Sequence, residues 1–323
     1  MGGQVLIELA LQSTGLTQKA LAEKLGVSPT QISKWKKGEY ISSEMESGLR
    51  AITGIGEQDP AVILWSGSLA DAKKWNKLIG FLGKLAYEGD ETGYEIYPLL
   101  DEPESLSSSI FYLLHEIGVS IPSPFPTGLA LDYEDMEDVE AQEIFDNSLV
   151  SLLNQILKAY TDVYGFYMAY IDDLIQDDSL QLYDTPAINI ESELLALAAC
   201  KVSISSKIAP QYRSFRARTL SDYEEWLSIV KDRAFRANVP LKAELLDLIH
   251  ASNDEIGACA EQESLGLIAS RLHPDIYMNE LLVGMRAIHQ VLPAIIEKLG
   301  IDFTLDSSVF SHSKPSYTSP NDD

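Results

Sequence analysis

The stretch LTQKALAEKLGVSPTQISKWKKGEY, residues 16–40, constrains the fold more tightly than any other part of the chain. It carries start and stop signals for two short helices. Thr17 can cap the first helix, and Gly26 follows its last residue, where a left-handed backbone is common. Ser28 can cap the second helix, with a proline next in the favoured first position, and Gly38 ends it. The pattern predicts two short helices joined by a tight turn.

The apolar residues of this stretch are spaced to form one shared core beneath the two helices. Ala22 is small enough to let the helices approach. The residues expected to fill the core are Leu21, Leu25, Val27, Ile32 and Trp35. The second helix then presents an outer face of hydroxyl, amide and ammonium groups, which suits the DNA major groove. That face consists of Thr30, Gln31, Ser33, Lys34 and Lys37.

The motif TQKALAEKLGVSPTQISKWKKG resembles the helix-turn-helix of Cro and phage repressors, the Xre-like regulators, and the resemblance covers residues 4–56. It implies that Gln18 and Ser28, at helix N-termini, contact phosphates. It also implies that Thr30 and Lys34 read bases, with Gln31 flanking them. Only the N-terminal part of the chain carries this resemblance.

Two residues depart from the family pattern. Pro29 stands where such proteins often carry a polar base-reading residue, so that donor is lost. Lys36 replaces the usual acidic residue after the tryptophan and, with Lys37, is expected to strengthen attraction to the DNA backbone. Residues 1–84 carry a net charge of only +2, so one copy should bind DNA weakly at physiological salt. A homodimer on two half-sites about 34 Å apart is therefore expected.

The negative charge of the chain lies behind this segment. The formal net charge is −25, and residues 85–200 hold 24 acidic residues against a single lysine. Such a block cannot lie along a nucleic-acid backbone, so we expect the body to be held away from DNA and its repulsion to suppress non-specific binding. The acidic run 132–140 is predicted to be a solvated loop and helix start, or alternatively a docking surface for a basic partner protein.

The rest of the chain shows helical periodicity and little evidence of strands. Helices are predicted over 68–87 and 106–117. The longest periodic segment, 138–176, follows an eleven-residue repeat typical of a nearly straight helix, with Gly165 as its weakest point. We interpret it as a central core helix, with a dimer-forming helix as the alternative. Further helices are predicted over 191–204, 222–236 (with a capping box at Ser221 and Glu224), 240–251, 254–271 and 276–299.

The last of these helices has a heptad-like seam. Its apolar residues are Leu281, Met285, Ile288, Leu292, Ile295 and Leu299, in steps of 4, 3, 4, 3 and 4. Pro293 is expected to kink it. The seam favours a structural helix, with a dimerisation helix as the alternative.

The predicted fold is all-α, with an N-terminal helix-turn-helix domain of four to five short helices and a larger helical-bundle body. The predicted divisions are 1–65 for the DNA-binding domain, 66–104 for an amphipathic helix and connector, 105–302 for the acidic body and 303–323 for a flexible tail.

Catalytic signals are weak. The sequence has no H-E-x-x-H zinc motif, no nucleophile elbow and no phosphate loop. We therefore expect no enzyme activity, no cofactor and no metal site. A second basic cluster, Arg213, Arg216 and Arg218, is predicted to pair with the acidic body, or alternatively to bind nucleic acid or a phosphorylated ligand. No apolar run approaches the roughly 18 residues of a membrane helix, so a cytoplasmic protein without membrane contact is expected.

These features predict a sequence-specific transcriptional regulator of double-stranded DNA, a dimeric repressor that reads a palindromic operator through helix 29–37. Two alternatives remain. One is an antitoxin-like or regulatory interaction protein whose acidic body binds a basic partner protein. The other is a regulator whose body responds to a small molecule or peptide.

Overall fold

The computed structural model describes residues 2–100, 103–133 and 144–250, and near the C-terminus 284–285, 288 and 291–301. The predicted all-α fold is confirmed, because these residues form helices and no strand among them. The α-helices are α1 (Gly2–Thr14), α2 (Gln18–Leu25), α3 (Pro29–Trp35), α4 (Ser43–Thr53), α5 (Pro60–Ser66), α6 (Leu69–Glu88), α7 (Tyr97–Leu100), α8 (Pro103–Ile117), α10 (Ser148–Tyr170), α11 (Asp172–Gln176), α12 (Leu194–Lys201), α13 (Tyr212–Ala237) and α14 (Asp247–His250). Short 3-10 turns cover Thr127–Leu129, Leu182–Asp184, Pro186–Glu193 and Ala243–Leu246.

The helices α1 to α4 form a small N-terminal domain around an apolar core. Leu6 and Ile7 of α1 and Leu49 of α4 are at most 1% exposed. The N-cap of α4 is Ser42, whose hydroxyl accepts a hydrogen bond from the amide of Met45.

Helix α5 joins the N-terminal domain to the body. It packs on α1 on one side and on α6 and α8 on the other. Its apolar residues Val62 and Ile63 are 3% exposed, and the apolar core continues through them without interruption from the domain into the body. Because burial of this area from water stabilises both partners, α5 is a fixed attachment rather than a free linker.

A polar network lies beside α5 at the same joint. The Arg50 guanidinium donates hydrogen bonds to the carbonyls of Gly56 and Gln58, at 2.9 and 3.0 Å. The Gln58 side chain accepts from Asn76 Nδ2 of α6 at 3.1 Å and donates to the Glu104 carboxylate of α8. The chain segment that leaves the N-terminal domain is thereby tied to two helices of the body.

Helix α10 is the central helix of the body, which agrees with the interpretation as a core helix. It packs on α6 and α12, and most of its residues are buried. It begins after Asn147, whose side chain caps it, so a helix unbroken from 138 was wrong; residues 138–143 lie outside the described part. The helix passes through Gly165 without a break. A Cβ at Gly165 would lie 2.5–2.8 Å from the side chain of Thr92, so the glycine lets another segment approach closely.

Helix α13 begins ten residues earlier than predicted. Ser221 and Glu224 lie inside it and do not form its start. Its first residue, Tyr212, is buried and donates a hydrogen bond to the Val202 carbonyl at 2.6 Å. This tertiary contact stabilises a first helical turn that the local sequence does not predict. The helix predicted over 254–271 and the tail 303–323 lie outside the described residues, whereas 291–299 is helical.

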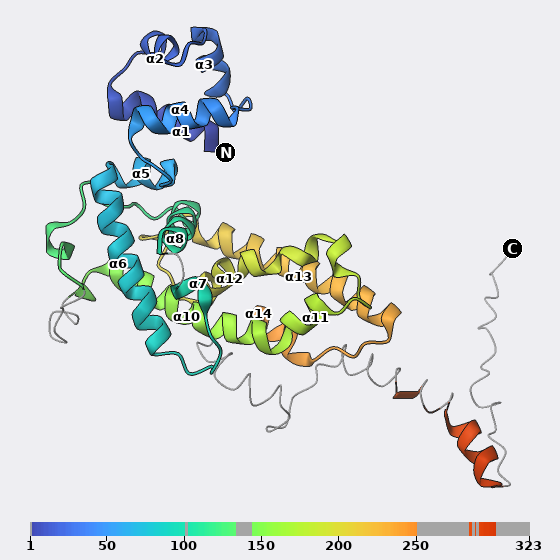
Figure 1. The fold of residues 1–323 in the computed structure, drawn as a ribbon. Coiled ribbons are helices and arrows are strands. Elements are labelled where there is room, and N and C mark those ends of the chain that lie inside the picture. The colour runs from blue at the N-terminus through green and yellow to red at the C-terminus, as the bar shows by residue number, and fades with distance from the viewer. Residues whose placement is uncertain are drawn as a thin grey trace, which may run out of the picture.

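Helices α2 and α3 lie at one end of the molecule. In Figure 1 the helices α2 and α3 are on the side of the N-terminal domain that points away from the body, with α1, α4 and α5 between them and the body. None of the described helices combines the length and apolar character needed to cross a membrane.

Candidate nucleic-acid interface

The turn between α2 and α3 is fixed by the local sequence. Gly26 adopts a left-handed backbone with φ of +67°, and its amide donates to the carbonyls of Ala22 and Glu23. The Val27 amide also donates to the Ala22 carbonyl, at 2.9 Å. Ser28 then caps α3 by accepting from the Gln31 amide at 3.2 Å. These are the cap positions predicted from the sequence, and they hold α3 at a defined angle to α2.

Burial divides α3 into two faces. Ile32 is fully buried and Trp35 is 4% exposed, so both are anchored in the domain core. Thr30, Lys34 and Lys37 are exposed, and their spacing of four and three residues places them on one face of the helix and the turn that follows. Neutral and cationic donors on a firmly anchored helix can reach base edges and phosphates.

The other predicted residues lie around this face. Gln31 and Ser33 are half-buried, and Lys36 is exposed at the end of α3. The Ser33 hydroxyl donates to the Pro29 carbonyl at 3.2 Å and lies 3.5 Å from Gln18 Oε1 of α2. Ser33 therefore supports the packing of α2 against α3 and turns its proton away from solvent.

The two predicted phosphate contacts lie at helix starts. Gln18 is the first residue of α2, and the amides of a helix's first turn have no acceptor within the helix. Thr17 accepts from the Ala20 amide, and the Gln18 amide is left to bind a group outside the helix. Ser28 uses its oxygen as an acceptor, which leaves its O–H free to donate to an anion. Both groups can therefore donate to phosphate oxygens.

Two residues of this surface have no counterpart in the sequence prediction. Glu39 lies 3.4 Å from the Lys34 ammonium, and both side chains are about half exposed. Tyr40 is 84% exposed, the most exposed of the large apolar side chains described. Gly38, with φ of +93°, turns the chain so that both residues follow directly on the end of α3. The available sequence signal for Tyr40 was an aromatic residue three positions after the lysine pair Lys36 and Lys37.

The second basic cluster lies on α13, in the body. Arg218 forms an ion pair with Glu116 of α8, and the Arg216 guanidinium donates to the Cys200 carbonyl at 3.2 Å. Arg213 is exposed. Arg218 thus contacts an acidic residue of the body and Arg216 a backbone carbonyl, and α13 lies far from α3 in Figure 1. The role of the cluster stays a prediction.

A capped helix, a glycine turn and a second helix with a polar exposed face define a helix-turn-helix DNA-binding domain. A family model described as Helix-turn-helix matches residues 7–53, and the N-terminal domain belongs to this Cro/C1-type family. The matched family is a DNA-binding regulator domain and not an enzyme family. The match does not extend into the body. Neither the curated proteins nor the solved structures gave a match to the chain.

Proposed function

We propose that this protein is a dimeric transcriptional repressor that reads a palindromic operator by inserting α3 into the major groove. The observation that carries the proposal is the exposed face of α3, formed by Thr30, Lys34 and Lys37 on a helix that Ile32 and Trp35 anchor. Base edges are read by Thr30 and Lys34, with Gln31 beside them. Phosphates are contacted by Gln18, Ser28, Lys36 and Lys37.

The test of this assignment is binding to an operator obtained by selection from random duplex DNA. Lys34→Ala should weaken operator binding by about 1–3 kcal/mol and relax preference at one base position in each half-site. Lys36→Ala should weaken all sequences alike and lower the salt dependence of binding by about one phosphate contact per copy. Lys24→Ala, on the exposed side of α2, is the matched control. Unchanged binding in both Lys34→Ala and Lys36→Ala refutes the assignment.

Dimerisation is assigned to the C-terminal helix that contains residues 291–299. The apolar side chains along it are exposed by 41–65%; they are Met285, Ile288, Val291, Ile295 and Leu299. Ile288, Ile295 and Leu299 belong to the heptad-like seam predicted from the sequence, together with Met285 and the half-buried Leu292, and Val291 lies beside that seam. A second copy of the same helix is the partner that fits a seam with this repeat.

Light scattering on the full chain tests the dimer. The double variant Ile295→Glu/Leu299→Glu places charges in the seam and should convert the dimer to a monomer, with operator affinity falling by more than a hundredfold. Glu297→Gln, on the same helix, is the control and should leave the mass unchanged. A double variant that remains dimeric rules out this seam, and a monomeric wild-type chain at micromolar concentration rules out the dimer.

A further inference from the structure

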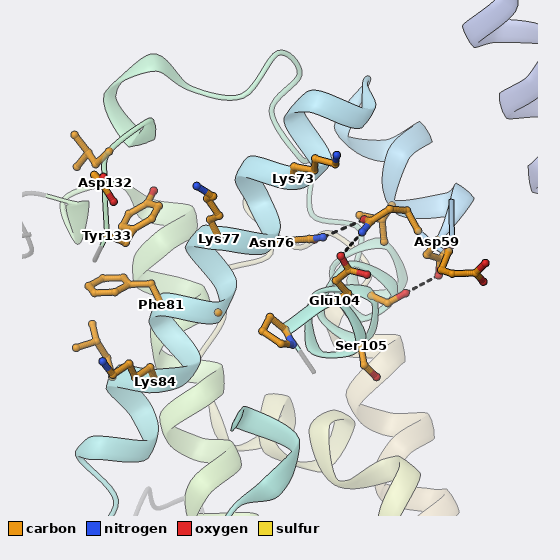
Figure 2. A pocket seen from close by; sticks show the side chains of 18 of the residues that line it. Asp59, Lys73, Asn76, Lys77, Phe81, Lys84, Glu104, Ser105, Asp132 and Tyr133 are labelled. Carbon is orange, nitrogen blue, oxygen red and sulfur yellow. Dashed lines mark hydrogen bonds between the residues drawn. The ribbon is translucent and has the colours of Figure 1, made fainter. Parts of the chain in front are cut away.

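Two grooves in the described part of the chain differ in the charge of their walls. The groove beside α6 has a volume of about 1280 Å³, and five carboxylates and three lysines line it. Figure 2 shows Lys73, Lys77 and Lys84 along α6. Asp132 and Glu104 lie on opposite sides of that helix in the same view. Because charges of both signs line this groove, its charge selects neither an anion nor a cation.

A second groove, of about 820 Å³, lies beside α8. Its walls come from α7, from α8, and from the 3-10 turn Pro186–Glu193 with the start of α12. None of its lining residues, all of which lie in the described part of the chain, is a lysine, an arginine or a histidine. We call it the tyrosine–glutamate groove, after the lining residues Tyr97, Tyr112, Tyr160, Glu116, Glu191 and Glu193. Its charge is therefore negative.

The carboxylates of the tyrosine–glutamate groove are close enough to repel one another. Partial burial raises the pKa of the Glu193 carboxyl, and the negative charges of Asp222 and Glu116 raise it further. The Arg218 guanidinium opposes this rise, and it forms an ion pair with Glu116. Among the described residues, Glu191 and Glu193 form no ion pair. A second cation beside these two glutamates therefore relieves their repulsion.

Two aromatic rings of the same groove are open to solvent. Tyr97 is 54% exposed and Tyr112 is 42% exposed. The Tyr112 ring meets the Trp65 ring edge to face, with the ring centres 5.1 Å apart, and the Tyr97 hydroxyl donates to the Glu95 carboxylate. These contacts hold both rings in place. Aromatic faces beside carboxylates attract a guanidinium or an ammonium group.

The length of the tyrosine–glutamate groove suits a peptide segment. Ser105, Ser109, Tyr112 and Glu116 line it in steps of four, three and four residues, so they lie on one face of α8. They extend over about 16 Å at 1.5 Å per residue, which is the length of about five residues of extended chain. Ser105 and Ser109 are exposed, and their hydroxyls can form hydrogen bonds with a peptide backbone. Apolar residues of α8 and α12 also line the groove.

We propose that the tyrosine–glutamate groove binds a basic segment of a partner protein. One arginine or lysine of that segment pairs with Glu191 and Glu193, and another lies against the ring of Tyr97 or Tyr112. The serine hydroxyls of α8 bind the segment's backbone, and an aliphatic side chain between the basic residues packs on the apolar wall. A free polyamine supplies the charge but neither the backbone nor the aliphatic side chain. This site does not depend on the DNA-binding role of the N-terminal domain.

Isothermal titration calorimetry on the full chain at 0.15 M salt tests the site. The probe is a blocked pentapeptide of sequence Arg-Leu-Arg-Leu-Arg, compared with Gln-Leu-Gln-Leu-Gln and with spermidine. We expect the basic peptide to bind once per chain and more tightly than either comparator. The double variant Glu191→Gln/Glu193→Gln should weaken its binding by about fivefold, because two exposed charge pairs are lost. Asp173→Asn/Asp178→Asn is the matched control, since it removes two exposed carboxylates of the same acidic block outside the groove.

A second pair of variants tests the aromatic contact. Tyr97→Leu keeps an apolar side chain but removes the ring, and it should weaken binding of the basic peptide by about threefold. Tyr183→Leu is the control, because Tyr183 is 59% exposed and does not line the groove. A Tyr97→Leu variant that binds as tightly as the wild-type chain excludes the stacking contact.

The remaining outcomes decide whether the site exists and what occupies it. Absence of peptide binding at 1 mM overturns the site, and so does an affinity that falls equally in the glutamate variant and its aspartate control. Equal binding of the glutamine peptide excludes recognition by charge, and equal binding of spermidine makes the occupant a polyamine. A loss of dimer mass in Glu191→Gln/Glu193→Gln makes the occupant a second copy of this chain. None of these measurements uses DNA, so each leaves the proposed function to its own test.

Discussion

The ion pair between Lys34 and Glu39 gives a direct way to test whether α3 reads DNA. The two groups lie 3.4 Å apart with side-chain exposures of 52% and 50%. An exposed pair of this kind is worth about 0–1 kcal/mol. A lysine that reaches a guanine edge is worth about 1–3 kcal/mol in discrimination, so Lys34 is expected to leave Glu39 when the domain binds.

Removing the Glu39 charge should therefore tighten DNA binding. Glu39→Gln removes the competing partner of Lys34 and a negative charge that lies close to the phosphates. We estimate a gain of about 0.5–1 kcal/mol per half-site, taken from the range for exposed pairs. This corresponds to a twofold to fivefold tighter half-site, and to a fourfold to twenty-fivefold tighter operator for a dimer.

Fluorescence anisotropy with labelled operator at several salt concentrations measures this change. The gain should be largest at low salt, where exposed charges are least screened. Glu23→Gln on α2 removes the same charge from an exposed position with no ion pair among the described residues, so it is the matched control. An affinity that Glu39→Gln leaves unchanged or lowers, or an equal gain in Glu23→Gln, would refute the proposed orientation of α3.

Three further variants test a close contact at Gly165, the buried lysine Lys201 and the helix cap Ser28. Gly165→Ala should destabilise the chain by about 1–3 kcal/mol in denaturant unfolding, because its methyl group overlaps Thr92; an unchanged midpoint would contradict this close approach. Burial lowers the pKa of Lys201 from 10.5 to about 8, so the folded state disfavours its ammonium form. Wild-type stability should therefore rise relative to Lys201→Met between pH 8 and pH 10.5, by about 3 kcal/mol over the full window, and parallel pH profiles would exclude this effect. Ser28→Ala should cost about 1 kcal/mol in thermal unfolding through loss of the α3 cap, and an equal melting temperature would show that the cap is dispensable.

Local sequence signals explain why both the existence of α2 and α3 and the residues that cap their N-termini could be predicted. Thr17, Gly26 and Ser28 act within one turn of the chain, so no distant contact is needed to specify the caps. The start of α13 could not be found in this way. Its first turn depends on the packing of Tyr212 and Phe215 against distant segments, which overrides the capping pattern further along the helix.

The same distinction between local signals and tertiary contacts applies to the functional surfaces. The polar face of α3 follows from helical periodicity, because the buried positions of Ile32 and Trp35 leave the other side exposed. The pairing of Lys34 with Glu39 depends on the turn after α3, which the spacing of residues does not specify. The groove beside α6 is lined by segments as distant in sequence as Gln58 and Tyr133, so sequence patterns could not predict it.

The position of the N-terminal domain limits how far the acidic body can repel DNA. Helices α1, α4 and α5 separate α3 from the body, and each helix with its side chains is about 10 Å across. The Debye length is about 8 Å at 0.15 M salt, so most of the body's charge is screened from DNA bound at α3. On this geometry we predict that repulsion contributes little to selectivity at this salt concentration; the sequence-based prediction that it suppresses non-specific binding stays to be tested. If the protein binds as the proposed dimer, its preference for a paired site then rests on the weak attraction of each nearly neutral domain. At 0.01 M salt the Debye length is about 30 Å, and only there should the body weaken non-specific DNA binding relative to a fragment of residues 1–66.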